Sequence, residues 1–202
     1  MEKNITSITP ENITTFRNYG FALTPVKMDK SPATKNGSWC KDWSDTELLN
    51  AKRIGVFHKD SGIQDVDFDD KNFIAHKFID MLPPTLTIGK YVDGVVIGTH
   101  KTYKIPNDEE ANRYSFPSSA NKGDKIIEIL TSTQTIIAGV DRVIINNVEP
   151  IEINPTELQM HCRLIAAFSE LYLHWPKPDS KMRDEAFLKL AGALTRETDI
   201  PT

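Results

Sequence analysis

The stretch IGVFHKDSGIQDVDFDD, residues 54–70, carries four aspartates in its last six positions. Asp65, Asp67 and Asp69 alternate with two apolar residues. Alternate residues of a strand lie on the same face, so the pattern predicts a strand with carboxylates on one face and a buried apolar back. An acidic turn or a solvated strand end is the alternative. If the strand forms, something must offset the repulsion between the carboxylates.

A second acid stands in a similar setting further along the chain. The segment KIIEIL, residues 125–130, places Glu128 among four apolar neighbours, which is typical of an interior strand. A buried carboxylate needs a partner, and a lysine or arginine would suffice. Taken with the aspartate stripe, however, Glu128 fits a site for Mg²⁺ or Mn²⁺, which prefer carboxylate oxygens and often share them with substrate phosphates.

The hydrophobic pattern around these acids predicts an α+β fold. A body over residues 1–152 is expected to precede a helical tail over residues 153–202, which either packs on the body or begins a further domain. Helices are expected at 10–18, 45–52, 70–82, 156–175 and 180–197. Strands are expected at 21–27, 53–58, 61–69, 85–89, 94–100, 101–105, 125–130, 134–139 and 142–147, with long loops at 28–45 and 109–124.

Composition excludes several classes of protein. The net charge of −4 argues against a nonspecific nucleic-acid coat, which is usually basic. No apolar run is long enough for a membrane span, and the first residues lack the pattern of a signal peptide. The two cysteines form no CxxC pair, which favours a reducing, cytoplasmic location. No GxxxxGK[ST] segment is present, so a P-loop motor is not expected.

One histidine has neighbours that suggest a function. His100 ends the apolar segment GVVIGTH, follows the small Gly98, and precedes Lys101 and Lys104. A histidine at a strand end is more often a structural hydrogen-bonding group. Beside two lysines, it could instead donate to a phosphate.

These segments together resemble the archaeo-eukaryotic primase superfamily, in the primase-polymerase branch found in phages and plasmids. YGFALTPVKMDKSP resembles its opening strand and lysine-proline loop. Residues 54–70 resemble its first motif, GTH its second, and IIEILTSTQTIIAG its third. Asp69 and His100 are 31 residues apart, and His100 and Glu128 are 28 apart, as in that family. The resemblance implies a mixed-sheet catalytic core, an RRM-like module plus an N-terminal α/β module, with C-terminal helices.

The resemblance also implies a role for each residue. Asp67, Asp69 and Glu128 would hold Mg²⁺ or Mn²⁺ for a two-metal nucleotidyl transfer, and His100 would contact the nucleotide phosphates. Lys30, Lys101 and Lys104 would assist nucleotide binding. Asp65 falls where the family has an apolar residue, so it is either a supporting group or a sign that the register is shifted by two. Gly98 replaces a serine of the second motif, and IIAGVDR departs from a Pro-Ser pair and a later histidine.

The expected function is therefore a DNA primase or polymerase that makes or extends primers on single-stranded DNA from NTPs or dNTPs. A replicative helicase would be a further partner, and the protein would act in the cytoplasm of a host cell. A nicking replication initiator is disfavoured, because it needs a His-hydrophobe-His pair that this sequence lacks. A metal-dependent nuclease, or an inactive module that binds single-stranded DNA or nucleotide, remains as an alternative.

Overall fold

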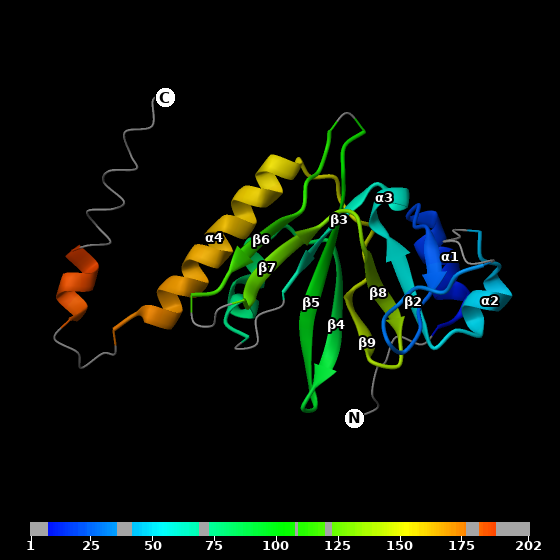
Figure 1. Cartoon of the computed structure of the whole chain (residues 1–202), viewed down its shortest axis with the longest axis horizontal. Helices are drawn as coiled ribbons and strands as arrows, with labels where there is room; N and C mark the ends of the chain where they lie inside the picture. Colours follow the sequence, from blue (N-terminus) through cyan, green and yellow to red (C-terminus); the bar gives the residue numbers. More distant parts are fainter. Residues whose placement is uncertain are drawn as a thin grey trace.

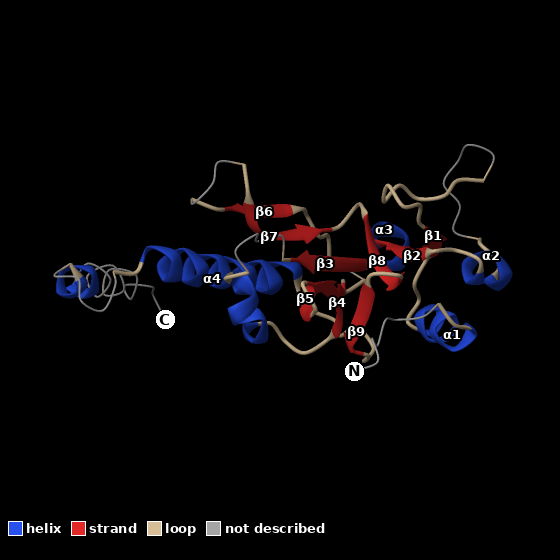
Figure 2. Cartoon of the chain, turned by 90° about the horizontal axis from the view of Figure 1, so that it is seen from below, coloured by secondary structure: helices blue, strands red, loops and turns tan. Residues whose placement is uncertain are grey.

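The computed structural model describes residues 8–35, 42–68, 73–107, 109–119, 123–176 and 182–188. The chain forms two antiparallel sheets with helices packed at both ends, which confirms the expected α+β class. Figure 2 shows the strands lying between helix α4 (Pro155–His174) at one end and helices α1 (Pro10–Asn18) and α2 (Asp45–Leu49) at the other.

The larger sheet has six strands in the order β6-β7-β3-β5-β4-β9. The aspartate strand β3 (Ile63–Asp67) lies inside it, between β5 (Val95–Lys104) and β7 (Lys125–Leu130). The remaining strands are β4 (Leu86–Val92), β6 (Tyr114–Pro117) and β9 (Arg142–Asn146). All of β3 pairs with β5, and Asp65, Val66 and Asp67 pair with β7 as well, so the side chains of this part of β3 are held at fixed positions.

Helix α4 covers one face of this sheet (Figure 1). Its buried residues Leu158, Cys162 and Ile165 share a core with Val66 of β3, and the short 3₁₀ helix η1 (Ala75–Met81) completes that core. Asn154 caps the helix by accepting hydrogen bonds from two backbone N–H groups of the first turn. The first part of the predicted tail is thus packed on the body.

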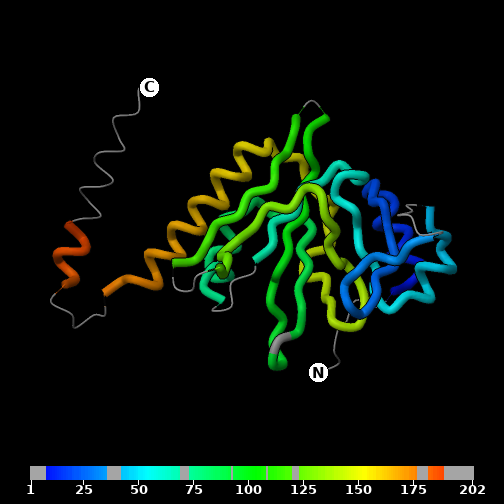
Figure 3. Tube along the Cα trace, in the orientation of Figure 1, coloured from blue at the N-terminus to red at the C-terminus, as the bar shows by residue number. Residues whose placement is uncertain are grey.

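The smaller sheet consists of β1 (Leu23–Pro25), β2 (Arg53–Phe57) and β8 (Gln134–Gly139), in that order. Together with α1 and α2 it encloses a second core, to which β3, β4 and β8 contribute Ile63, Ile88 and Ile137. The short helix α3 (His58–Ser61) connects β2 to β3. Figure 3 shows the chain leaving this sheet through β8 and turning into β9, which pairs with β4 in the larger sheet. The turn between β8 and β9 therefore connects the two sheets.

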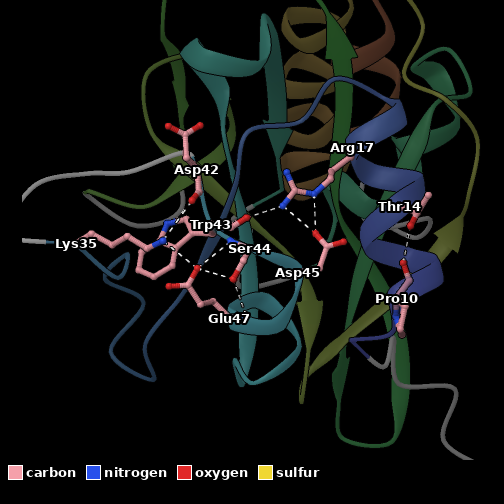
Figure 4. A network of polar contacts seen from close by, with 9 residues as sticks. All are labelled: Pro10, Thr14, Arg17, Lys35, Asp42, Trp43, Ser44, Asp45 and Glu47. Atoms are coloured by element: carbon pink, nitrogen blue, oxygen red, sulfur yellow. Dashed lines mark hydrogen bonds and ion pairs between the residues drawn. The ribbon is translucent and has the colours of Figure 1, made fainter.

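A polar network fastens the loop before α2 (Figure 4). Arg17 of α1 donates to the Trp43 carbonyl and to Asp45, and Ser44 and Glu47 cap α2 reciprocally. Lys35 contacts Glu47 at 2.9 Å and lies 4.5 Å from the centre of the Trp43 ring. The hydrogen bond from Lys35 lowers the pKa of Glu47 to about 2, so this contact weakens only as the pH falls towards that value.

Several expected elements differ in the structure. The expectation of a mixed sheet is wrong for the described strands, because every ladder between them is antiparallel and the one parallel pairing is an isolated bridge between Lys104 and Glu152. For β4 and β5 the reason is local, because strands joined by so short a turn can pair only in this way. The two strands expected at 94–100 and 101–105 form the single strand β5, and the expected loop 109–124 contains β6.

Other expectations are confirmed. Helix α1 spans the predicted residues, with Thr9 as its cap and Pro10 as its first residue. Strands β7 and β8 match their predicted bounds, and β9 ends one residue earlier. Among the described residues, no helix is both long and apolar enough to cross a membrane.

The packing of α4 can be tested with two neighbouring residues of that helix. Ile165 has no exposed surface, whereas Leu164 is 45 % exposed. Ile165→Ala should lower the free energy of unfolding by about 2–5 kcal/mol, because it leaves a cavity in the core. Leu164→Ala should change it by no more than about 0.5 kcal/mol. Urea denaturation measures both values, and equal effects would contradict the packing of α4 on the sheet.

Candidate active site

Three of the predicted site residues come together because of the register of β3. Asp67 is the direct partner of His100 on β5 and of Glu128 on β7. Directly opposed residues of antiparallel strands lie on the same face, with Cβ atoms about 4.5–5.5 Å apart. The three side chains therefore share the face of the sheet opposite α4. Asp69, the fourth predicted residue, lies outside the described residues.

Asp65 shares this face but has a different environment. Its carboxylate has no exposed surface and accepts hydrogen bonds from Thr102 at 3.0 Å, Thr135 at 2.7 Å and His100 Nδ1 at 2.8 Å. Burial raises the pKa of Asp65, but the positive charge and hydrogen bond of His100 oppose it, and the net shift is downward. Since both oxygens are occupied and enclosed, Asp65 is a supporting group and not a metal ligand.

A second histidine extends this buried network. His58 is fully buried, and its Nε2 lies 2.9 Å from the Thr135 hydroxyl. The Thr135 hydroxyl gives its proton to Asp65, so it must accept from His58 Nε2. Burial lowers the pKa of His58, which favours the neutral ring that this arrangement requires. Sequence reasoning assigned no function to His58 and did not connect it with His100.

His100 is held between two carboxylates. Its Nδ1 lies 2.8 Å from Asp65 and 3.6 Å from Asp67, and its side chain is 12 % exposed. Burial by itself lowers the pKa of His100, but the charges of Asp65 and Asp67 raise it, and the net direction is upward. The surroundings thus favour a positively charged imidazole, and Nε2 is the ring nitrogen available to another molecule.

A cavity of about 180 Å³ opens beside His100. It is lined by Lys30, Asp67, His100, Leu130, Gln134, Thr135, Ile136 and Arg142. Lys30 and Arg142 are cationic side chains, His100 favours its charged form, and Asp67 supplies a carboxylate. Such a cavity suits an anion that also brings or shares a cation.

Lys30 reaches the cavity from a tight turn. The turn is closed by a hydrogen bond from Lys30 N–H to the Lys27 carbonyl, and Asp29 accepts from the backbone and hydroxyl of Ser31. Gln134 donates to the Lys30 carbonyl at 2.8 Å, which fixes the turn against β8. The φ of Lys30 is 68°, a left-handed conformation that costs a side-chain residue about 1–2 kcal/mol. A lysine kept there despite this cost points to a role for its side chain.

Arg142 is the cavity residue that sequence reasoning missed. Its side chain is 8 % exposed, and Nε donates to the Ile136 carbonyl at 3.2 Å. Its guanidinium lies 3.8 Å from the Asp141 carboxylate, which Arg53 binds more closely, at 3.0 Å. Burial lowers the pKa of Arg142, as expected of a guanidinium with weak compensation. The departure IIAGVDR from the family pattern contained this arginine, but its spacing gave no sign of the cavity.

Glu128 is paired with cations of the protein. Its Oε1 receives Lys125 at 2.8 Å, Arg113 at 3.0 Å and the Ser115 hydroxyl at 3.1 Å. Burial raises the pKa of Glu128, but the hydrogen bonds from Lys125 and Arg113 lower it more, and the carboxylate is held in its charged form. The simpler of the two interpretations of Glu128, an ion pair with lysine or arginine, is therefore present in the structure.

Two of the predicted nucleotide-binding lysines lie elsewhere. Lys101 is buried on the other face of β5, where its Nζ donates to the carbonyls of Leu82 and Pro83. Lys104 has the parity of His100 but is four residues further along the strand, and it pairs with Glu149 at 2.6 Å. Successive side chains alternate in a strand, so only one of two adjacent residues can reach a given site. The structure brings Lys30 to the cavity, but not Lys101 or Lys104.

The described acids fit a divalent cation in part. Asp67 and Glu128 offer carboxylates on adjacent strands, and Mg²⁺ is commonly held by one or two carboxylates plus substrate phosphates. In the described part of the chain, no group of three His, Cys, Asp or Glu side chains is arranged to hold a metal ion. A third oxygen ligand would have to come from Asp69 or from the substrate's phosphates.

Comparisons with known proteins add no family. No protein-family model matches the chain, and no curated protein matches its sequence. The resemblance to the primase superfamily therefore depends on the motifs quoted above.

The ion pairs of Glu128 lead to a prediction about metal affinity. Arg113→Ala should raise the affinity for Mn²⁺ by up to about fivefold, because the cation no longer competes with an exposed guanidinium for Oε1. Isothermal calorimetry with MnCl₂ measures this affinity. Lys104→Ala, which removes a comparable lysine–glutamate pair away from the cavity, is the control and should leave it unchanged. If Glu128→Gln also leaves Mn²⁺ affinity unchanged, Glu128 is not a metal ligand.

Proposed function

We propose that this chain is a nucleotidyltransferase of the DNA primase or polymerase type, which makes or extends primers on single-stranded DNA from nucleoside triphosphates. The observation that carries the proposal is the cavity in which Lys30, His100 and Arg142 surround Asp67. A triphosphate needs several cationic donors, and the metal that accompanies it needs carboxylates. Both kinds of group meet in this one place.

The cations have separate tasks in this proposal. Arg142 has a planar guanidinium that can donate two parallel hydrogen bonds to phosphate oxygens. His100 would donate from Nε2, and Lys30 would add a flexible charge from its turn at the mouth of the cavity. Because the Arg142 and His100 side chains are hydrogen-bonded before the substrate arrives, they would stabilise charge on the phosphates with little rearrangement. Transfer of a nucleotidyl group depends mainly on such positioning and charge stabilisation.

The carboxylates would hold the metal. Asp67 and Glu128, with Asp69 by resemblance, are the residues for Mg²⁺ or Mn²⁺. When bound, such an ion neutralises phosphate charge and makes a hydroxyl a better nucleophile. Asp67 also lies near His100 Nδ1, so one side chain would link the metal side of the site to the phosphate side. A helicase partner and an origin in a phage or plasmid are supported by the resemblance only and stay predictions.

The direct test is nucleotide incorporation. Wild-type protein is incubated with primed or unprimed single-stranded DNA, Mg²⁺ or Mn²⁺, and labelled NTPs or dNTPs, and the products are sized on a gel. Elongated or newly made labelled strands are expected from the wild type, and at least a hundredfold less from Asp67→Asn, since one lost charged ligand costs about 3 kcal/mol or more. Asp60→Asn, an exposed aspartate of α3 that does not line the cavity, should behave as wild type.

Other outcomes of this assay identify other functions. Shortening of the DNA without incorporation of label would indicate a metal-dependent nuclease, which uses paired carboxylates as well. Binding of DNA or nucleotide with neither reaction would indicate an inactive replication module. Full incorporation by Asp67→Asn would reject the site.

Lys30 allows binding to be separated from stability. Lys30→Gly should leave the free energy of unfolding unchanged to within about 1 kcal/mol, because glycine adopts a φ of 68° without strain but gains entropy in the unfolded chain. The same change should weaken binding of tripolyphosphate about tenfold, since a hydrogen-bonded charge is lost. Calorimetry and thermal melts measure the two effects. Lys27→Ala in the same turn is the control, and equal weakening by both would show that only general charge matters.

A further inference from the structure

The carboxylate of Asp65 is fully buried and accepts hydrogen bonds from Thr102, Thr135 and His100, yet it has no part in the proposed transfer. We propose that Asp65 is a positioning residue for His100: it accepts the hydrogen bond from Nδ1–H and thereby holds the ring so that Nε2, which also carries a proton when the imidazole is charged, faces the anion cavity. This inference rests on the proposed role of His100 in phosphate binding. It concerns the geometry of the ring, however, and can be tested without nucleotide incorporation.

The direction of each hydrogen bond in the network follows from its partners. Thr135 donates to Asp65 Oδ2 and accepts from His58 Nε2, and Thr102 donates to Oδ1. A charged carboxylate only accepts, so His100 must donate from Nδ1 to Oδ2. The hydrogen bond made by one ring nitrogen decides the state of the other. Every donor around Asp65 therefore points inward, and Nε2 of His100 is left for the cavity.

Asp65, and not Asp67, holds the ring. Its Oδ2 is 2.8 Å from Nδ1, which is a short hydrogen bond, whereas the corresponding distance from Asp67 is 3.6 Å, which is too long for one. Asp65 is also fully buried, while the side chain of Asp67 is 24 % exposed. The hydrogen bond that holds the imidazole is therefore the one to Asp65.

The network has the form of a built support. Thr102 comes from β5 of the larger sheet and Thr135 from β8 of the smaller one, and both are nearly or fully buried. Burial of a charge without partners is costly, so a carboxylate in this position implies that its hydrogen bonds are needed. An apolar residue of similar size would remove the acceptor of Thr102, Thr135 and His100 Nδ1, and it could not hold His100.

The state of the ring can be observed by ¹⁵N-edited NMR of the histidine side chains. At a pH at which His100 is neutral, its proton should remain on Nδ1 in the wild type. Asp65→Asn should retain this state, because the amide oxygen takes the place of Oδ2, where two donors meet, and the amide NH₂ faces Thr102. Asp65→Ala should lose it. A neutral wild-type ring whose one proton is on Nε2 overturns the proposal without any variant, which covers the case that Asp65→Ala fails to fold.

Binding of tripolyphosphate supplies the second readout. Asp65→Ala should weaken it about tenfold, close to the effect of His100→Ala, because a ring that is free to turn no longer presents a fixed donor. Asp65→Asn should lie nearer to the wild type, and Thr102→Val, which removes a hydrogen bond to Oδ1 only, is the matched control for the cost of a lost buried contact. Affinity retained in Asp65→Ala, or lost equally in Thr102→Val, overturns the proposal.

These results separate the inference from the proposed function. Wild-type protein that keeps Nδ1 protonated and binds tripolyphosphate, but incorporates no nucleotide, supports the inference and rejects the primase assignment. Nucleotide incorporation by a wild-type protein whose neutral ring carries its proton on Nε2 supports the primase assignment and rejects the inference.

Discussion

The buried carboxylate of Asp65 is the constraint on which the centre of the molecule depends. It accepts hydrogen bonds from both sheets, since Thr102 belongs to β5 and Thr135 to β8. A charge in the interior is tolerated only with a full set of partners, so the two sheets can approach in few ways other than the one that supplies them. The place of His100, and the depth of the cavity beside it, follow from that arrangement.

The same principle explains how the chain tolerates its carboxylate stripe. Asp65 has hydroxyl and imidazole donors, Asp67 lies near the imidazole of His100, and Glu128 receives Lys125 and Arg113. Each acid is thus balanced by the protein itself. Any metal that binds to Asp67 or Glu128 must compete with, or rearrange, these protein groups. In the proposed function, substrate and metal would therefore bind together. The metal would take the place of the protein's cations beside the carboxylates, and those cations would then pair with the substrate's phosphates.

The two faces of the larger sheet have different roles. One face packs Val66 and its neighbours against α4 and gives stability. The other carries Asp67, His100 and Glu128, and it is completed by residues from distant segments, namely Lys30 from the first loop and Arg142 from β9. Since β3 lies between β5 and β7, a substitution on its apolar face should affect stability more than it affects the site. The left-handed Lys30 and the weakly paired Arg142 are, by contrast, features that folding alone does not explain.

The sequence by itself determined the local features of this protein. Period-two alternation identified β3, short apolar runs identified β7 and β8, and a threonine followed by proline identified the start of α1, because these signals depend on neighbouring residues only. It also selected Asp67, His100 and Glu128 as a group. The tertiary structure decided what local pattern could not: that all described ladders are antiparallel, that β6 forms within an apparently polar loop, and that Lys101 points away from His100. It also brought Lys30 and Arg142 into one cavity and buried Asp65. Which residue pairs with a charged side chain depends on how distant segments pack, and the spacing of residues in the sequence does not predict it.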